Sequence, residues 1–194
     1  MLASGEGTTL QALLDASAHP SYGASVVAVG SDRVGARALD RARASAVTAF
    51  SVGHGDLTRT EWDHALTRAV SEHQPDLVVC AGFMRILGPA FLDRLVGRTI
   101  NTHPSLLPAF PGRQAVVDAL AYGVKVTGVT VHFVDAGVDT GPVIAQAAVP
   151  VLAGDTPDSL HERIKVVEQP LLVDTVGRLA RGTWTVEERT VLLS

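Results

Sequence analysis

The sequence predicts an α/β protein whose mostly parallel sheet carries antiparallel strands toward the carboxyl end. Three observations lead to this prediction. Strand-like apolar runs alternate with helical patterns up to about residue 125, which is typical of parallel sheets. The runs 24–30 and 76–81 are almost continuously apolar, as in strands buried on both faces. Two further strand-like runs, 126–134 and 143–149, have only a turn-rich loop between them.

The expected elements follow one another in a regular order. Residues 1–4 form a short apolar stretch before a glycine turn, and Leu10, Leu13 and Leu14 then have helical spacing. Strands are expected at 24–30, 47–50, 76–81, 98–102, 126–134 and 143–149. Helices are expected at 36–44, 58–74, 89–95, 114–122 and 157–182, with a terminal hairpin over 184–193.

Two helices carry recognisable start signals. Thr58 with Glu61 three residues later is a capping-box pattern. Thr156 followed by Pro157 matches an N-cap with proline at the first helical position. Within the last helix, Pro170 is expected to interrupt and kink the helix, because the carbonyl of Val166 loses its backbone partner there.

Composition limits the classes of function. The chain has 194 residues and a net charge of −4, so there is no electrostatic case for a nucleic-acid or anionic-membrane partner. The single cysteine, Cys80, excludes an internal disulfide and lies in an apolar run, where an inert buried thiol is expected. No apolar run reaches the roughly 20 residues that span a bilayer. We expect one cytoplasmic domain over 1–194, with a first strand that is longer in relatives.

The first candidate site is the glycine turn Ser4-Gly-Glu-Gly-Thr-Thr9. A turn that opens a helix presents free backbone N–H groups and the positive end of the helix dipole, which bind phosphate. Position 10 is leucine, so the dinucleotide pattern G-x-G-x-x-G is incomplete, and the Walker lysine is missing. A phosphate monoester fits better than a dinucleotide or a triphosphate, with a purely structural turn as the alternative.

The second candidate site contains Asn101, His103 and Asp139. Asn101 and His103 are two apart on one strand and should project from the same face. A loop with prolines at 104, 108 and 111 follows them, ending in Gly112. If the loop with Asp139 folds over the strand end, its carboxylate would raise the pKa of His103, and Asn101 could donate to an oxyanion. A structural role for each residue stays open, and no serine or cysteine is placed to complete a hydrolytic triad.

Other polar residues have ordinary explanations beside functional ones. The seven histidines show no zinc-like spacing, so no metal site is expected, and His132 is interpreted as a packed or supporting group. Arg85 is either a surface residue or a clamp for a carboxylate. Glu168 is either a solvated helix charge or a ligand contact.

Several motifs together resemble the folate-dependent formyltransferase family. They are Asn101-Thr-His103-Pro-Ser-Leu-Leu-Pro108 with Phe110-Pro-Gly112, Ala81-Gly-Phe-Met-Arg-Ile-Leu87, Val131-His-Phe-Val134 through Asp139-Thr-Gly-Pro-Val143, and Ser4-Gly-Glu-Gly7 with Leu10-Gln11. The resemblance covers nearly the whole chain. It implies a Rossmann-like formyltransferase fold with helices on both faces of the sheet. It also implies formyl transfer from 10-formyltetrahydrofolate to the amine of glycinamide ribonucleotide in purine (IMP) biosynthesis.

The resemblance also implies roles for individual residues. Asn101, His103 and Asp139 would be catalytic, and the amine would attack the formyl carbon directly through a tetrahedral intermediate. Gly7, Thr8 and Thr9 would bind the substrate phosphate, and Glu168 would contact the nucleotide substrate. Arg85 would meet the glutamate tail of the folate. The folate-binding set implied is Met84, Arg85, Ile86, Leu87, Val134, Asp135, Gly137 and Val138.

The chain departs from the family pattern at Gln114, where relatives usually have histidine, and at Thr9, where asparagine is frequent. Three alternatives stay open: a formyltransferase acting on methionyl-tRNA, a 10-formyltetrahydrofolate deformylase, and a non-catalytic folate or nucleotide binder. The expected partners are the two small-molecule substrates, with a homodimer as an open option.

Overall fold

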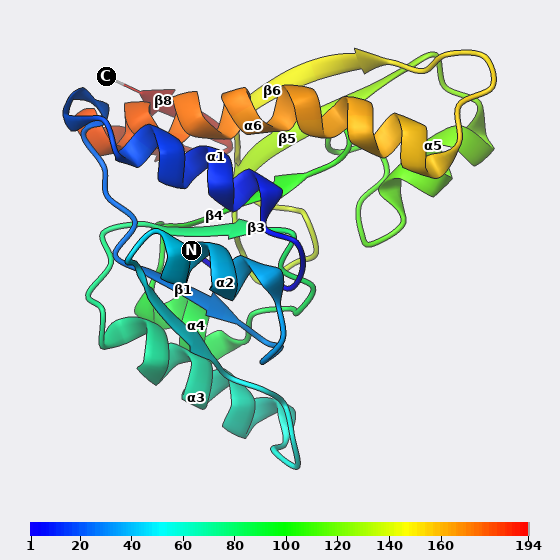
Figure 1. Ribbon diagram of the computed structural model, residues 1–194. Helices are drawn as coiled ribbons and strands as arrows, with labels where there is room; N and C mark the ends of the chain where they lie inside the picture. Colours follow the sequence, from blue (N-terminus) through cyan, green and yellow to red (C-terminus); the bar gives the residue numbers. More distant parts are fainter. Residues whose placement is uncertain (194) are drawn as a thin grey trace. The chain divides into compact units, whose positions relative to one another are not determined.

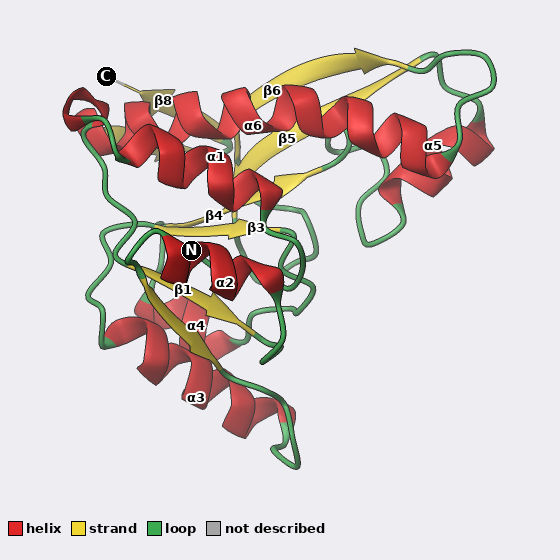
Figure 2. Cartoon of the chain, in the orientation of Figure 1, coloured by secondary structure: helices red, strands yellow, loops and turns green. Residues whose placement is uncertain are grey.

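A computed structural model describes residues 1–193 (Figures 1 and 2). The chain forms two compact units, and the boundary between Ile100 and Asn101 lies inside strand β4 (Thr99–His103). Ser194, the last residue of the predicted domain, lies outside the described residues. Each unit is described by itself.

The first unit alternates strands with helices, as the sequence predicts. Strands β1 (Ala28–Ser31) and β2 (Thr48–Ser51) pair in parallel, with Ala28 opposite Thr48. The remaining elements are α1 (Thr8–Ser17), the 3₁₀ turn η1 (Pro20–Tyr22), α2 (Arg37–Ala44), α3 (Arg59–Ser71), β3 (Val78–Ala81) and α4 (Pro89–Arg94).

The first three residues lie between β1 and β3. Leu2 forms parallel bridges to Gly30 and Cys80, and its N–H donates to the carbonyl of Val79 at 2.8 Å. Against this ladder packs an apolar cluster from α1, β1 and α2, made up of Ala3, Leu10, Leu14, Val29, Ala36, Ala38, Leu39 and Ala42. The ladder and this cluster hold the glycine turn at the start of α1.

The second unit contains the antiparallel strands. Within it the order is β4, β5 (Val126–Phe133), β6 (Val143–Pro150), and β5 pairs antiparallel with β6. The register shifts between Val131 and His132, which marks a β-bulge. Helices α5 (Ala115–Tyr122) and α6 (Pro157–Arg181) pack on this sheet, and β7 (Trp184–Glu187) pairs with β8 (Thr190–Leu193). The core of this unit is Val116, Val129, Val149, Leu160 and Ile164.

The α/β fold class is confirmed, as are the expected hairpin and the capping box of Thr58 with Glu61. The first long strand was predicted too early: β1 starts at Ala28, because Val27 is 51% exposed and residues 24–27 do not form a buried run. The predicted interruption at Pro170 was also wrong, since α6 continues through it. Pro170 and Val166 both lie on the exposed face, where water can bind the carbonyl that lost its partner.

No helix within residues 1–193 combines the length and apolarity needed to cross a bilayer.

Candidate active site

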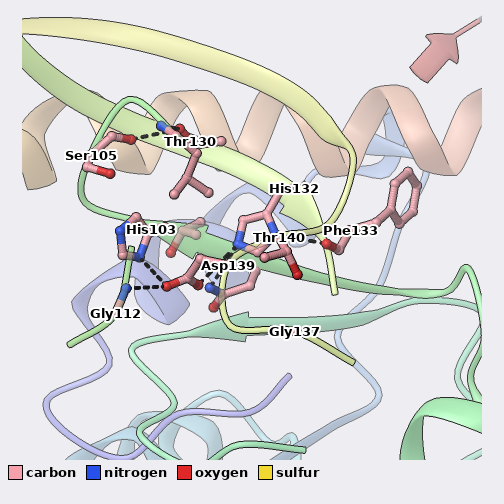
Figure 3. Close-up of polar contacts among 12 residues, drawn as sticks. His103, Ser105, Gly112, Thr130, His132, Phe133, Gly137, Asp139 and Thr140 are labelled. Atoms are coloured by element: carbon pink, nitrogen blue, oxygen red, sulfur yellow. Dashed lines mark hydrogen bonds and ion pairs between the residues drawn. The ribbon is translucent and has the colours of Figure 1, made fainter. Parts of the chain in front are cut away.

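The proline loop after β4 is held in place by side-chain hydrogen bonds. Ser105 donates its hydroxyl to the carbonyl of Ala109 at 2.5 Å. Thr130 of β5 donates to the carbonyl of Ser105 at 2.7 Å and accepts from the N–H of Leu107 at 3.0 Å. The loop therefore packs on β5 (Figure 3) and returns its later residues to the end of β4.

His103 is buried, and both of its ring nitrogens have partners. Nε2 lies 2.8 Å from the carbonyl oxygen of Phe110, and Nδ1 lies 3.2 Å from Oδ2 of Asp139. A carbonyl oxygen only accepts, so Nε2 carries a hydrogen. Burial lowers the pKa of His103 and outweighs the Phe110 carbonyl and the Asp139 carboxylate, which favour the charged ring. A proton that reaches Nδ1 is therefore stabilised by Asp139 rather than by water.

Asp139 joins the loop after β5 to the proline loop. Its Oδ2 accepts from the N–H of Gly112 at 2.7 Å, and its backbone is left-handed with φ +55°, a conformation that costs a non-glycine residue free energy. Burial by itself would raise the pKa of Asp139. The imidazole of His132, the N–H of Gly112 and the imidazole of His103 together outweigh burial and lower this pKa. Asp139 is thus held as a carboxylate beside His103. The expected rise in the pKa of His103 does not occur, because burial outweighs the carboxylate.

Asn101 projects toward a second histidine. Its Nδ2 lies 3.2 Å from Nε2 of His132, whose Nδ1 lies 2.8 Å from the carbonyl oxygen of Phe133. The same Nε2 lies 3.6 Å from Oδ1 of Asp139. Figure 3 shows His103 and His132 on either side of Asp139. The side-chain amide of Asn101 has a second hydrogen, which the contact with His132 leaves available.

Glu168 of α6 packs against the middle residue of the Asn-Thr-His sequence. Thr102 donates its hydroxyl to Oε1 of Glu168 at 2.5 Å. Burial raises the pKa of Glu168, although the Thr102 hydroxyl opposes that change. The interpretation of Glu168 as an ordinary solvated charge is therefore wrong, because this carboxyl group is largely removed from water.

In the first unit, the glycine turn is built tightly against α2. Gly7 precedes α1 with φ +69°, and a Cβ there would lie 2.8 Å from the Cα of Ala38. The carbonyl of Gly5 accepts from the N–H of Ala38 at 3.1 Å. The helix has no side-chain cap, so the N–H groups of its first residues, Thr8 and Thr9 included, point toward the turn.

Ser4 links this turn to the connection after β3. Its hydroxyl accepts from the N–H of Met84 at 2.9 Å, and its N–H donates to the carbonyl of Gly82 at 3.1 Å. Arg85, which is 45% exposed, donates Nε to Oδ2 of the buried Asp32 at 3.0 Å. The guanidinium therefore has a protein partner at its Nε–H.

The residues expected to bind folate are mostly exposed. In the first unit Met84 and Ile86 are 46% and 55% exposed, whereas Leu87 is 7% exposed and belongs to the core. In the second unit Val138 is 49% exposed. The adjacent turn is closed by Asp135, whose Oδ1 accepts from the N–H of Gly137 at 3.1 Å and from Thr140 at 2.6 Å. Both segments therefore leave apolar side chains in contact with solvent.

The structure thus brings together the predicted residues in two sets. Asn101, His103 and Asp139 form one cluster in the second unit, where Glu168 contacts Thr102. The glycine turn and the connection Met84–Leu87 form the other set, in the first unit. Among residues 1–193 no group of three or more histidine, cysteine, aspartate or glutamate side chains is arranged to hold a metal ion.

Sequence reasoning missed two supporting residues, Thr102 and Asp32. It interpreted His132 as a packed or supporting group and placed Ser4 in the glycine turn, but it did not predict the contacts of either residue. Thr102 lies in the mostly polar strand Thr99–His103, so no pattern singled it out, whereas His132 lies between the apolar residues Val131 and Phe133. Ser4 belongs to the glycine-turn motif, but its contact with Met84 spans 80 positions. Asp32 directly follows a predicted strand, where an acid is usually interpreted as a turn former.

Comparison with known proteins identifies the family of this chain. Residues 1–176 match the family described as formyl transferase. A Mycobacterium tuberculosis protein named phosphoribosylglycinamide formyltransferase is 59% identical over 194 residues, covering 100% of this chain and 89% of the relative. A Drosophila melanogaster protein named trifunctional purine biosynthetic protein adenosine-3 is 43% identical over 186 residues, covering 94% of this chain and 14% of the relative.

Solved structures give the same result. The crystal structure of glycinamide ribonucleotide transformylase 1 from Symbiobacterium toebii superposes with a TM-score of 0.96 at 44% identity. The match covers 99% of this chain and 91% of that chain. Since one family model spans most of the sequence and a relative of similar length shares more than half of its residues, the chain belongs to the formyl transferase family.

Proposed function

We propose that this protein transfers the formyl group of 10-formyltetrahydrofolate to the amine of glycinamide ribonucleotide, a step of purine (IMP) biosynthesis. It would thus be a phosphoribosylglycinamide formyltransferase, like the relatives that carry this name. The observation that carries the proposal is the pair of His103 Nδ1 and Asp139 Oδ2, 3.2 Å apart, with His103 on the same strand as Asn101.

The reaction requires the movement of one proton and one acyl group. The substrate amine attacks the formyl carbon, and the carbonyl oxygen becomes an alkoxide. The available amide hydrogen of Asn101 is the donor for that oxygen. A proton leaves the attacking nitrogen, and the folate nitrogen takes up a proton as the carbon–nitrogen bond breaks. The His103–Asp139 pair supplies a place for this proton, because charge on the ring is stabilised by the carboxylate.

The transfer needs no covalent intermediate on the protein. The products are a formamide on the acceptor and tetrahydrofolate, so the atoms balance without water or an external oxidant. His103 can also act as a second oxyanion donor, but only after Nε2 leaves the carbonyl of Phe110. In the arrangement described here the ring is a proton carrier, and Asn101 is the oxyanion donor.

We assign the remaining candidate residues to binding. The turn with Gly7, Thr8 and Thr9 would bind the substrate phosphate through backbone N–H groups, and Glu168 would contact the nucleotide. The folate would contact Met84–Leu87, with Arg85 at its glutamate tail, and the loop Val134–Val138. The exposed apolar side chains in both segments support this assignment.

We also propose that residues 1–194 act as one formyltransferase domain, without a metal and in the cytoplasm. The formyl transferase family match over 1–176 supports one functional domain. A homodimer is part of the proposal and is tested by light scattering of the purified chain over a range of concentrations. A mass that stays at the 20.3 kDa of one chain excludes the dimer.

The proposed activity is tested by turnover of the purified protein with 10-formyltetrahydrofolate and one acceptor at a time. Glycinamide ribonucleotide should yield tetrahydrofolate and an equal amount of formylated product. Methionyl-tRNA should yield neither, and without any acceptor the folate should remain formylated. Formation of tetrahydrofolate at the same rate without an acceptor would instead identify a deformylase. If no acceptor leads to tetrahydrofolate, formyl transfer is refuted.

A further inference from the structure

His132 has contacts that an ordinary packed core histidine does not need. Its side chain is 2% exposed, and it lies at the β-bulge where the pairing of β5 with β6 shifts register. Bulges redirect side chains and occur next to active sites. Here the ring reaches Asn101 and Asp139, which flank the space for the formyl oxygen in the proposed reaction.

The hydrogen bonds of His132 define its tautomer. Nδ1 lies 2.8 Å from the carbonyl oxygen of Phe133. Because that oxygen can only accept, Nδ1 must carry a hydrogen. In a neutral ring, Nε2 is then a lone-pair acceptor, and it lies 3.2 Å from Nδ2 of Asn101.

This tautomer determines how the amide of Asn101 is oriented. The amide has a donor end and an acceptor end of nearly the same shape, and its partners decide which way it points. A lone pair on Nε2 attracts the NH₂ end. One amide hydrogen then binds His132, and the other remains available as a donor. A hydrogen on Nε2 would instead attract the carbonyl end, turn the NH₂ end away and remove the donor from its position.

A hydrogen on Nε2 of His132 would also change the partners of Asp139. Oδ1 of Asp139 lies 3.6 Å from Nε2, and His103 binds the other oxygen of the same carboxylate. If His132 took up a proton, its Nε2–H would pair with Asp139 and compete with His103 for that carboxylate. Catalysis therefore needs His132 neutral, so that Asn101 keeps its orientation and Asp139 stays with His103.

We propose that His132 is a positioning residue, and that its neutral, Nδ1-protonated ring holds the Asn101 amide with the NH₂ group presented to the formyl oxygen. The catalytic consequence of this inference rests on the proposed function, whereas the tautomer of His132 is independent of it. The role is distinct from core packing, which would require only the volume of the ring.

The kinetic test uses His132→Leu, which keeps much of the volume, and His132→Gln, which keeps an acceptor near the position of Nε2. We expect His132→Leu to lower kcat by about 30-fold while KM for each substrate changes less than about threefold. His132→Gln should recover most of the loss. In an Asn101→Ala background, His132→Leu should cost less than about threefold, because the amide it orients is absent. His64→Leu on the exposed face of α3 is the matched control and should behave as the wild type.

The second test needs no activity. Long-range ¹H–¹⁵N spectra of the labelled protein at neutral pH should show His132 protonated at Nδ1 and unprotonated at Nε2, with its signals assigned by their loss in His132→Leu. A hydrogen on Nε2 would overturn the inference, whether or not the protein transfers formyl groups. So would an equal loss of kcat from His132→Leu with and without Asn101, or a Gln variant as slow as the Leu variant. A wild type without formyl transfer would refute the proposed function and leave the tautomer to be judged from the spectrum.

Discussion

Replacement of Asp139 by asparagine removes one charge and almost no volume. The amide oxygen of the substituted side chain can still accept from the N–H of Gly112, which Asp139 binds at 2.7 Å, so the loop geometry should survive. What is lost is the attraction between the carboxylate and a proton on His103 Nδ1, 3.2 Å away. At an effective dielectric constant of about 20, this attraction is about 5 kcal/mol. The side chain of Asp139 is 13% exposed, so solvent screening reduces it only modestly.

The expected kinetic effect follows from that free energy. About 4 kcal/mol of lost stabilisation in the transition state corresponds to a fall in kcat of about 10³-fold. The assay is formyl transfer at saturating concentrations of both substrates, with thermal unfolding measured on the same samples. Asp118→Asn, an exposed acid on α5, is the matched control and should keep wild-type kcat. A folded Asp139→Asn variant with kcat within about threefold of wild type would refute the role of the ion pair.

Four further predictions concern stability, binding and reactivity. Asp63→Ala leaves the buried N–H of Gly88 and the partly buried N–H of Ala90, at the start of α4, without the acceptor that binds each at 2.9 Å. Urea denaturation should show a fall in the free energy of unfolding of about 2–4 kcal/mol; a fall under about 0.5 kcal/mol contradicts this. Gly7→Ala puts alanine at φ +69° and places its Cβ 2.8 Å from a backbone atom of α2. The turn should distort, and KM for the phosphate-bearing substrate should rise about tenfold or more. An unchanged KM would show that the turn does not bind the phosphate. Burial raises the pKa of the Cys80 thiol to about 12, so a thiol reagent at pH 8 should react only after unfolding, whereas rapid reaction with the native protein would show an accessible thiolate. The bidentate guanidinium of Arg163 holds the pKa of Asp155 well below its usual value of 3.8. The stability that this ion pair contributes is therefore fully present above pH 3.8 and decreases as pH falls toward the pKa of folded Asp155. The stabilities of wild type and Asp155→Asn, measured by urea unfolding, should converge as the pH is lowered, and a difference that stays constant would exclude this ion pair as the cause.

Local patterns were enough to predict most of the fold. The alternation of apolar runs and helical spacing placed β3 and α5 within about two residues and α3 within about three, because period and capping are local properties. The start of β1 was misplaced because residues 24–27 are apolar but do not form a buried run. Pro170 was expected to break α6, and only the position of this residue on the exposed face explains why the helix continues.

The candidate site was predictable where its residues share a strand or a motif. Asn101 and His103 follow from strand periodicity, and Asp139 was included on the condition that its loop folds over the strand end. The contacts of His103 with Phe110 and of Asn101 with His132 were not predictable, because they depend on the loop conformation and on a bulge in β5. The contact between Thr102 and Glu168 spans 66 positions, and no local pattern encodes it.

The central claim is that the imidazole of His103, paired with Asp139, is required for formyl transfer. The most direct measurement is a single-turnover reaction of His103→Ala with 10-formyltetrahydrofolate and glycinamide ribonucleotide, beside wild type, after both proteins have been shown to be folded. The variant should bind both ligands and form formylated product at least about 10³-fold more slowly than wild type. Product formation by the folded variant at the wild-type rate would contradict the claim.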